Sequence, residues 1–395
     1  MDRLLIISVS PLRQDPRVLR QIDLFKDRYE VITMGYGPSP DGVKKHVRLP
    51  RPAPTTALQK FRKALGALLG KHVENYQGFP GIWSAQDWLR THSDEFDAVL
   101  VNDLGPLPVA VGTGKPTHAD LHEYALGQHT NWLWRKYQLP VLEYCAEQLK
   151  RASSTTAVSA GIAALYDDQW DTHTKVVANT PHYQDGYRLL PTGRPIRLVY
   201  MGVGREVRSL DLPIEAVKRV NAARPGALTL DMYLAEAEAG YLEKLRLAAG
   251  DSSRTGVRIN DPVPANEMIS TLSQFDVAVV FFPPKTLNLK FTLPNKFFEA
   301  VQARIGVVTG PSPEMVPYLE RFGFGEATTG WTVDDLAQTL GSLTPEKVDQ
   351  WKAAADSAAA DLSSDEQDAV WAAAVSALFA SNSASDASSD ASDGK

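Results

Sequence analysis

The stretch that decides the fold runs from DVAVVFF (276–282) to LPNKFFEAVQARIGVV (293–308). Its first part is a short apolar run rich in valine, which is typical of a strand buried in a parallel sheet. After a loop, Pro294 marks a turn, a helical pattern follows over 295–303, and IGVV is a second apolar strand. A strand, a crossover helix and a second strand make one unit of an α/β domain.

The same alternation of strand and helix extends in both directions from this unit. In the second half of the chain we expect strands at 196–204, 227–234, 256–261, 276–282 and 305–310. In the first half we expect strands at 4–10, 29–37, 97–103, 115–121, 154–160 and 175–181. Parallel strands joined by helices cross over right-handed, and their ligands bind beyond the carboxyl ends of the strands. The sequence therefore predicts an α/β protein of two doubly wound, Rossmann-like domains facing across a cleft.

A segment without periodicity separates the two halves. HYQDGYRLLPTGRP (182–195) is rich in Pro, Gly and Tyr, so the interdomain linker is expected there. We place the first domain at 1–185 and the second at 186–344, followed by an Ala-rich helical segment at 345–380. The tail at 381–395 has no apolar residue larger than alanine and is expected to be disordered.

Length and composition suit a folded protein of two domains. The chain has 395 residues, 44% of them apolar and 22% charged, so neither a disordered nor a fibrous chain is indicated. Cys145 is the only cysteine, which excludes an intramolecular disulfide and a cysteine-held zinc site. It falls on a helical pattern, where we interpret it as a small apolar filler. Since the first strand begins almost at Met1 and no run reaches about 18 apolar residues, we expect a cytoplasmic protein.

A basic stretch stands out against the net charge of −6. Between Gly42 and Val73 there are eight basic residues and no acidic one, and apolar residues recur there at helical spacing. Two interpretations remain open: such a helix lies on an anionic membrane at its inner face, or its apolar stripe faces its own core. Nucleic acid is not expected as a partner, because the rest of the chain is acidic and carries no nucleic-acid motif.

A strand, a glycine turn and a helix open the second domain. In IRLVYMGVGREVR (196–208), Gly202 and Gly204 let the backbone approach a ligand, and the amides that follow can face a phosphate. Val207 stands where the dinucleotide fingerprint needs its third glycine, which disfavours a nicotinamide or flavin oxidoreductase. Arg208, at the carboxyl end of the strand, carries a guanidinium suited to a diphosphate, and a surface salt bridge is the alternative.

The deciding stretch carries polar residues on both sides of its turn. Asn288 and Lys290 lie in the loop, and Asn295, Lys296 and Glu299 follow on the helix. Glu299 lies about one turn into the helix, where its carboxylate can accept two hydroxyl hydrogen bonds from a ribose. The two lysines can neutralise phosphate charge as a nucleotide leaves. The stretch therefore indicates a nucleotide site in the second domain.

LPNKFFEAVQARIGVV resembles the nucleotide-sugar signature of the GT-B fold glycosyltransferases, particularly the large retaining family four of bacterial polysaccharide biosynthesis. Further segments are similar to that family in the same order: DPRVLRQIDLFK (15–26), DLHEY (120–124), AVSAGIAALY (157–166), VVANTP (176–181) and RSLDLPIEAV (208–217). The resemblance covers most of the chain, from about Leu4 to the Ala-rich helix. It implies the GT-B fold, with an acceptor-binding domain followed by a nucleotide-sugar-binding domain.

The resemblance also implies roles for individual residues. Glu299 matches the ribose-binding glutamate and Arg208 the arginine that holds the donor phosphate. His122, in ADLHEYA, matches the histidine of the first domain that reaches the transferred sugar near its reacting centre. His122, Arg208 and Lys290 then form the expected catalytic set, and Gly202, Gly204, Asn288, Asn295 and Lys296 complete the expected donor site.

On the acceptor side the sequence departs from the family. The first loop reads SVSPLRQDPRV (8–18), without the glycine pair of many relatives. Asp15 and Arg17 either take over polar contacts there or fix the start of the helix. Asp120 and Glu123 flank His122 closely, and we expect them to orient the histidine or cap the following helix.

Two absences bear on the donor. Many family members carry a second, sugar-contacting glutamate eight positions before the ribose-binding one, and Phe291 stands at that position here. The identity of the sugar is therefore open. The folded part contains no DxD pair to hold Mn²⁺ or Mg²⁺, so we expect basic side chains and a helix N-terminus to stabilise the leaving nucleotide without a metal cofactor.

These patterns predict a glycosyltransferase. The donor is a nucleotide-diphosphate sugar, and the acceptor is a hydroxyl of a glycan, lipid-linked or polyanionic molecule, as in cell-envelope polysaccharide assembly. Trp132, Trp134 and Tyr137 either stack on sugar rings or pack in the core. Two alternatives remain: a catalytically silent GT-B subunit that supports an active partner, and a nucleotide-sugar epimerase or hydrolase.

Overall fold

The computed structural model describes residues 1–51, 66, 70–77, 80–129 and 131–390. They form two compact units. Unit 1 comprises Met1–Ala178 together with Asp368–Lys395, and unit 2 comprises Asn179–Gln367. The expected linker at 182–195 has no helix or strand and belongs to unit 2, so the division falls a few residues before the position expected from the sequence.

Unit 1 is built on a seven-stranded parallel sheet with the order β3-β2-β1-β4-β5-β6-β7. Its strands are β1 (Arg3–Pro11), β2 (Glu30–Tyr36), β3 (Lys45–Arg48), β4 (Ala98–Asn102), β5 (Thr117–Leu121), β6 (Ser154–Ala157) and β7 (Lys175–Val176). The chain winds outward from β1 in one direction and from β4 in the other. The switch point, where ligands of such sheets bind, therefore lies between β1 and β4.

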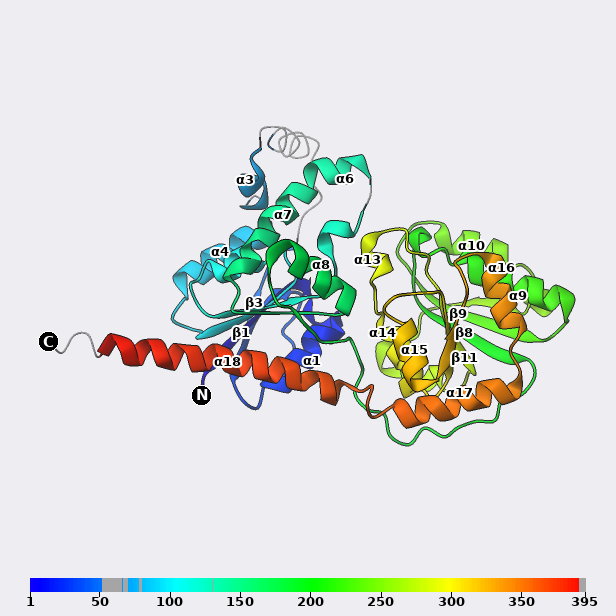
Figure 1. Ribbon diagram of the computed structural model, residues 1–395. Helices are drawn as coiled ribbons and strands as arrows, with labels where there is room; N and C mark the ends of the chain where they lie inside the picture. The colour runs from blue at the N-terminus through cyan, green and yellow to red at the C-terminus, as the bar shows by residue number, and fades with distance from the viewer. Residues whose placement is uncertain (52–65, 67–69, 78–79, 130, 391–395) are drawn as a thin grey trace. The chain divides into compact units, whose positions relative to one another are not determined.

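Helices cover both faces of this sheet (Figure 1). They are α1 (Pro16–Phe25), α3 (His72–Gln77), α4 (Pro80–Thr91), α5 (Leu107–Val111), α6 (Trp132–Tyr137), α7 (Leu139–Glu147), α8 (Ala160–Trp170) and the long α18 (Ser364–Asp390). Short 3₁₀ turns lie at Leu12–Gln14, Ala125–Gly127 and Gln148–Arg151. The helix α1 begins where it does because the side chain of Asp15 accepts a hydrogen bond from the amide of Val18.

The last helix, α18, returns to unit 1 and packs beside α1 (Figure 1). Trp371 is fully buried in a core with residues of β1, β4 and α1. The guanidinium groups of Arg17 and Arg20 lie 4.5 and 4.6 Å from its ring, and Arg20 also binds Asp368 at 2.6 Å. Cation–π contacts and an ion pair thus attach the end of the chain to its beginning.

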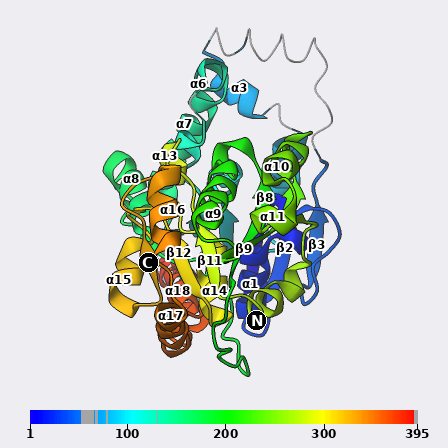
Figure 2. The same ribbon diagram turned by 90° about the vertical axis from the view of Figure 1, so that its right-hand side faces the viewer.

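Unit 2 repeats the architecture with six parallel strands in the order β10-β9-β8-β11-β12-β13 (Figure 2). The strands are β8 (Ile196–Gly204), β9 (Leu228–Glu236), β10 (Val257–Asn260), β11 (Val277–Val280), β12 (Gly306–Thr309) and β13 (Gly325–Ala327). The chain reverses its direction of winding between β8 and β11. The second switch point lies there.

The helices of unit 2 form two layers. They are α9 (Asp211–Ala223), α10 (Tyr241–Ala249), α11 (Ser252–Thr255), α12 (Met268–Leu272), α13 (Leu287–Lys290), α14 (Asn295–Gln302), α15 (Val316–Phe322), α16 (Val333–Gly341) and α17 (Pro345–Ala358), with 3₁₀ turns η4 (Glu206–Arg208) and η5 (Ala265–Glu267). On one side α9 packs against α16 and α10, and on the other α14 packs on α12 and α17. Buried Asp276 binds both Arg197 and Lys352, which joins the start of the sheet to α17.

Every strand expected from the sequence is present, and two short edge strands, β3 and β13, were not predicted. The Ala-rich segment is two helices that belong to different units, since α17 packs in unit 2 and α18 lies mostly in unit 1. The helix α18 extends to Asp390, which suits its many alanines, and the expected disorder of the tail from residue 381 stays a prediction. No helix of the described residues is both long and apolar enough for a bilayer crossing.

Candidate functional site

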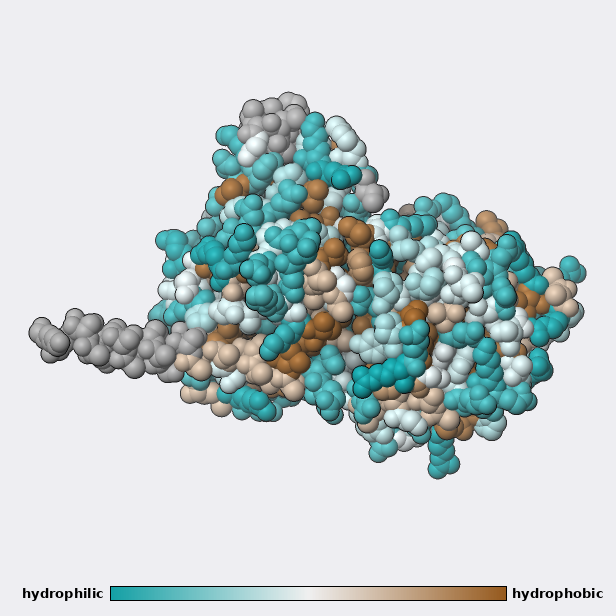
Figure 3. Space-filling model, viewed as in Figure 1, coloured by the Kyte–Doolittle hydropathy of each residue, from teal (hydrophilic) through white to brown (hydrophobic). Residues whose placement is uncertain are grey.

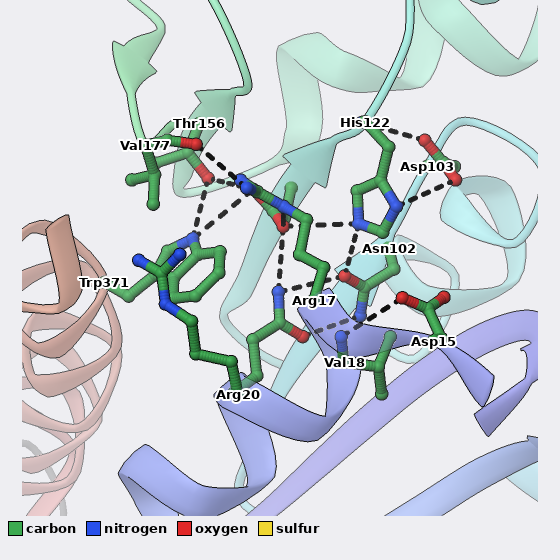
Figure 4. A network of polar contacts seen from close by, with 12 residues as sticks. Asp15, Arg17, Val18, Arg20, Asn102, Asp103, His122, Thr156, Val177 and Trp371 are labelled. Atoms are coloured by element: carbon green, nitrogen blue, oxygen red, sulfur yellow. Dashed lines mark hydrogen bonds and ion pairs between the residues drawn. The ribbon is translucent and has the colours of Figure 1, made fainter. Parts of the chain in front are cut away.

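In unit 1, polar side chains meet at the carboxyl ends of β1, β4 and β5, beside the switch point (Figure 4). Asn102 ends β4, Asp103 follows it, and Asp120 and His122 lie at the end of β5. Adjacent parallel strands place these ends side by side, so residues distant in the sequence contact one another.

Asp120 is the centre of this network. It is fully buried, and the guanidinium of Arg17 binds both of its carboxylate oxygens, at 2.6 and 2.7 Å. Gln21 donates to it at 2.8 Å and Thr156 at 2.6 Å. Burial alone would raise the pKa of Asp120, but the charge of Arg17 and the hydrogen bonds hold it well below its usual range. The pair is ionised and saturated with protein partners.

His122 lies between two carboxylates. Its Nε2 is 2.9 Å from Oδ1 of Asn102 and 3.4 Å from Asp120, and its Nδ1 is 3.6 Å from Asp103. Burial lowers the pKa of His122, but Asp103 and Asp120 outweigh burial and raise it. Since acceptors face both ring nitrogens, the charged imidazolium satisfies them best, and His122 acts as a hydrogen-bond donor.

Asp103 is not among the site residues expected from the sequence. Its backbone has φ of 66°, a left-handed conformation that aspartate tolerates better than most residues. One carboxylate oxygen accepts the backbone N–H of His122 at 2.9 Å, while the side chain remains 42% exposed. Asp103 thus joins the network to solvent. Its position directly after a buried strand was the available signal.

The other residues expected on the acceptor side, Arg17, Asp15 and Glu123, differ in their burial and in their partners. Arg17 is only 2% exposed, so it positions Asp120 and its guanidinium is turned away from solvent. Asp15 caps α1 and accepts a hydrogen bond from Ser10 at 2.7 Å. Glu123 is exposed and binds the side-chain amide of Gln128. The structure therefore assigns the helix start to Asp15 and the orientation of the histidine to Asp120.

In unit 2, a second cluster lies at the carboxyl end of β8, at the other switch point. Gly202 has φ of 151° and no side chain, and the space above it is surrounded by hydrogen-bond donors. A Cβ atom added there would collide with the ammonium of Lys296 and lie 3.4 Å from Nη1 of Arg208 and 3.5 Å from the hydroxyl of Tyr200. Glycine is favoured at 202 because L side chains rarely adopt this φ, and a Cβ atom would also displace the ammonium of Lys296.

The two cations of this cluster lack a carboxylate partner. Among the described residues neither Lys296 nor Arg208 forms an ion pair; Lys296 donates to the carbonyl oxygen of Met201 at 2.6 Å and lies 4.2 Å from the ring centre of Tyr200. Burial and the nearby charge of Arg208 lower the pKa of Lys296, against the opposing effect of Tyr200. Two adjacent positive charges without a counter-ion favour an anionic ligand.

Tyr200 is a third member that the sequence analysis missed. It is 1% exposed, and its hydroxyl has no hydrogen-bond partner of good geometry in the described part of the chain. Burial would raise its pKa, but Lys296 and Arg208 outweigh this effect and lower it. A tyrosine in a strand is typical of core packing, and only the fold reveals that its hydroxyl faces two cations.

Glu299 lies one turn along α14 from Lys296. No side-chain hydrogen bond or ion pair holds its carboxylate within the described residues. Burial raises the pKa of Glu299 to about 7, and the more distant charge of Lys296 offsets this only in part. A largely buried carboxylate without a donor is costly unless a ligand supplies hydroxyl groups.

The remaining donor-site expectations are met unevenly. At Gly204, a Cβ atom would lie 2.7 Å from the Cδ2 atom of Leu242, so this glycine leaves room for that side chain. Asn295 begins α14 and Asn288 lies in α13, both half-buried. Lys290 is exposed, with its ammonium 5.1 Å from the ring of Phe291, and the structure does not bring it into the cluster around Gly202.

Three further expectations concern other regions. Most of the basic stretch from Gly42 to Val73, including its apolar stripe, lies outside the described residues. Cys145 is a buried filler, as expected, and burial raises the pKa of its thiol to about 12. The described residues contain no group of three or more His, Cys, Asp and Glu side chains arranged to hold a metal ion.

Neither a protein-family model nor a curated protein matches the sequence. The fold, however, has many solved counterparts. The trehalose-phosphate synthase (UDP-forming) of Burkholderia vietnamiensis aligns with a TM-score of 0.69 and 10% identity over 97% of this chain and 99% of its own. The sucrose-phosphate synthase of Thermosynechococcus elongatus gives 0.69 and 13% over 96% and 100%.

A TarM variant of S. aureus, solved with UDP, fondaparinux and α-GlcNAc-glycerol, aligns with a TM-score of 0.68 and 9% identity over 95% of this chain and 99% of its own. These alignments span both units, and each unit has the parallel sheet that the sequence predicted. The chain therefore has the GT-B fold of two Rossmann-like domains.

Proposed function

We propose that the chain is a glycosyltransferase that moves a sugar from a nucleoside-diphosphate sugar to an acceptor hydroxyl. The observation that carries this proposal is the convergence of Lys296, Arg208 and Tyr200 on the space above Gly202. A diphosphate needs such cations, and the nearby carboxylate of Glu299 suits the two hydroxyls of a ribose. The names of structural neighbours, which include UDP-forming and UDP-bound proteins, are consistent with this assignment.

In this proposal unit 2 binds the donor. Arg208 and Lys296 hold the diphosphate, and the hydroxyl of Tyr200 donates a further hydrogen bond to it. In the transfer step the bond between the anomeric carbon and the diphosphate oxygen breaks, and the acceptor oxygen bonds to that carbon. Arg208 and Lys296 stabilise the negative charge that develops on the diphosphate. Because they supply this charge, the mechanism needs no metal ion.

We propose retention of the anomeric configuration, as the resemblance to family four implies. The leaving diphosphate then takes the proton of the acceptor hydroxyl on the same face of the sugar. His122 supports this choice because both of its ring nitrogens face acceptors, which suits an imidazolium that donates hydrogen bonds. In this role it removes no proton from the acceptor, and the resemblance to family four implies that it reaches the transferred sugar.

The acceptor belongs to unit 1. We propose a glycan, lipid-linked or polyanionic acceptor in cell-envelope polysaccharide assembly, and a cytoplasmic enzyme that contacts the inner face of the membrane through residues 42–73. The order of the sequence segments shared with family four supports this context.

One observation favours a second candidate. Phe291, where many relatives carry a sugar-contacting glutamate, ends α13 half-buried and cannot bind a sugar hydroxyl. A catalytically silent GT-B subunit that supports an active partner is therefore the alternative. An epimerase or hydrolase would instead turn over the donor without any acceptor.

A thermal-shift screen tests the donor assignment. The whole chain is melted with uridine, guanosine, cytidine and thymidine diphosphate sugars, each with and without a chelator. A ligand that binds only the folded state raises the melting temperature by mass action, and we expect one base to do so equally in both conditions. If no nucleotide sugar shifts the transition, the donor assignment is wrong; if only the chelator-free samples shift, the metal-free mechanism is wrong.

A further inference from the structure

A cavity of about 310 Å³ lies in unit 1 at the carboxyl ends of β1 and β2, on the same edge of the sheet as His122. Its walls come from the two strand ends, the start of α4, the turn after β4, and helices α6 and α7. The apolar and aromatic side chains that form most of the lining are Val9, Tyr36, Ile82, Trp134, Leu142 and Cys145.

The lining is electrically neutral. None of the described residues that border the cavity is charged, and Gln128 and Gln138 provide its side-chain amides. The thiol of Cys145 stays protonated near neutral pH because burial raises its pKa to about 12. A charged occupant would lose its hydration here without gaining a partner, whereas an apolar group gains from leaving water.

The cavity and the polar half-site of unit 1 share the turn that follows β4. Gly105, which forms part of the wall, follows two residues after Asp103, whose carboxylate accepts the backbone N–H of His122. Gln128, on another wall, donates to Glu123, the neighbour of His122 in the chain. A molecule with one hydroxyl near Asp103 and His122 therefore has an apolar space beside it. Figure 3 shows a mainly hydrophilic surface over α6 and α7, the helices that border this space, with a few hydrophobic residues among the polar ones.

We propose that this cavity binds the apolar group of the acceptor, so that the acceptor is a sugar or alcohol carrying an alkyl or aromatic aglycone. The inference rests on the proposed function, because it assigns a substrate class to the acceptor half-site. It selects among the acceptors considered there, and it disfavours a polyanionic glycan as the part held next to His122. The volume accommodates an alkyl group of at least six carbons, since liquid water takes about 30 Å³ per molecule.

Binding of n-alkyl glucosides, from methyl to heptyl and below their micelle-forming concentrations, tests this assignment without any donor. Calorimetric titration of the whole chain should show an affinity that rises roughly fourfold with each added methylene until the cavity is full. An affinity independent of chain length would overturn the inference.

Two substitutions locate the effect. Leu142→Trp fills the cavity, so the affinity should no longer depend on the length of the alkyl chain. Leu142→Ala enlarges the cavity, so the affinity should continue to increase for longer alkyl chains than in the wild type. Leu247→Trp, on exposed α10 of unit 2, is the matched control and should behave as the wild type. If both Leu142 variants retain the wild-type profile, the cavity is not the site.

Thermal melting of the same preparations with nucleotide diphosphate sugars distinguishes a failure of the donor assignment from a failure of the cavity assignment. Loss of nucleotide shifts with an intact chain-length profile contradicts the donor assignment alone. A flat chain-length profile with intact nucleotide shifts contradicts the cavity assignment alone.

Discussion

The charged side chains at the carboxyl ends of the two sheets differ in whether they have protein partners. In unit 1, Arg17 and Asp120 neutralise each other, and His122 is held by Asn102 and Asp103. Among the described residues of unit 2, Lys296 and Arg208 converge without a carboxylate partner, and half-buried Glu299 has no hydrogen-bond donor. Saturated charges contribute to the rigidity of the fold, whereas charges without protein partners favour a ligand. Breaking the charge pair of unit 1 should therefore lower stability, whereas substitutions in the cluster of unit 2 should weaken binding and need not lower stability.

The largest expected effect is in unit 1. Asp120→Asn leaves the buried guanidinium of Arg17 without a counter-charge, and removing one partner of a buried pair costs about 3–5 kcal/mol of unfolding free energy. Denaturant unfolding measures this loss. Asp87→Asn removes the partner of exposed Arg90 and is the control, with an expected change within about 0.5 kcal/mol. Equal effects of the two variants would refute the contrast between the units.

The second prediction concerns Glu299, whose substitution should raise the free energy of unfolding instead of lowering it. Its pKa is about 7 in the folded chain against 4.5 in a model peptide, so the folded state binds more protons between these pH values. Stability of the wild type should fall as the pH rises through this window. Glu299→Gln should then be more stable than the wild type by up to about 3 kcal/mol at pH 8 and equal to it at pH 4. A variant that is less stable at pH 8 would mean that a protein donor holds the carboxylate.

The third prediction separates binding from stability. Arg208→Ala removes a charged hydrogen-bond donor from the diphosphate, which should weaken nucleoside-diphosphate binding by about 10- to 100-fold. Its melting temperature without ligand should stay near that of the wild type, because Arg208 has no ion-pair partner among the described residues. Arg205→Ala, three positions earlier and exposed, is the control and should bind normally. Calorimetric titration gives both affinities.

The smallest expected effect belongs to Tyr200. Tyr200→Phe removes one neutral hydrogen bond to the diphosphate, so affinity should fall by roughly threefold to tenfold. Binding of the corresponding nucleoside without phosphates should be unchanged. A variant that loses nucleoside and nucleoside diphosphate equally would instead indicate that Tyr200 supports the fold of the site.

The sequence predicted the sheets well because buried parallel strands such as 276–282 are nearly continuous apolar runs. It missed β3 and β13, which are short edge strands with little apolar content. It predicted Arg208, Lys296 and Glu299 from local motifs, and the structure brings Arg208, in the turn η4 after β8, and Lys296, on α14, to the same space above Gly202.

Local sequence patterns could not predict the roles of residues that depend on long-range contacts. From the sequence, Lys290 and Lys296 have the same expected role, but Lys290 ends α13 and is exposed, whereas Lys296 on α14 is directed at Gly202. The saturation of Arg17 by Asp120 joins positions 103 residues apart, and Trp371 reaches them from the other end of the chain. Such pairings follow from the order of the strands, which single residues do not reveal.

The central claim is that unit 2 binds a nucleoside-diphosphate sugar in the cluster around Gly202. A crystal structure of the whole chain with the nucleotide sugar that gives the largest melting shift tests it most directly. The account predicts the diphosphate against Arg208 and Lys296, within hydrogen-bond distance of the Tyr200 hydroxyl, and the ribose hydroxyls on the carboxylate of Glu299. A nucleotide bound elsewhere, with these four side chains unchanged and without ligand contacts, would contradict it.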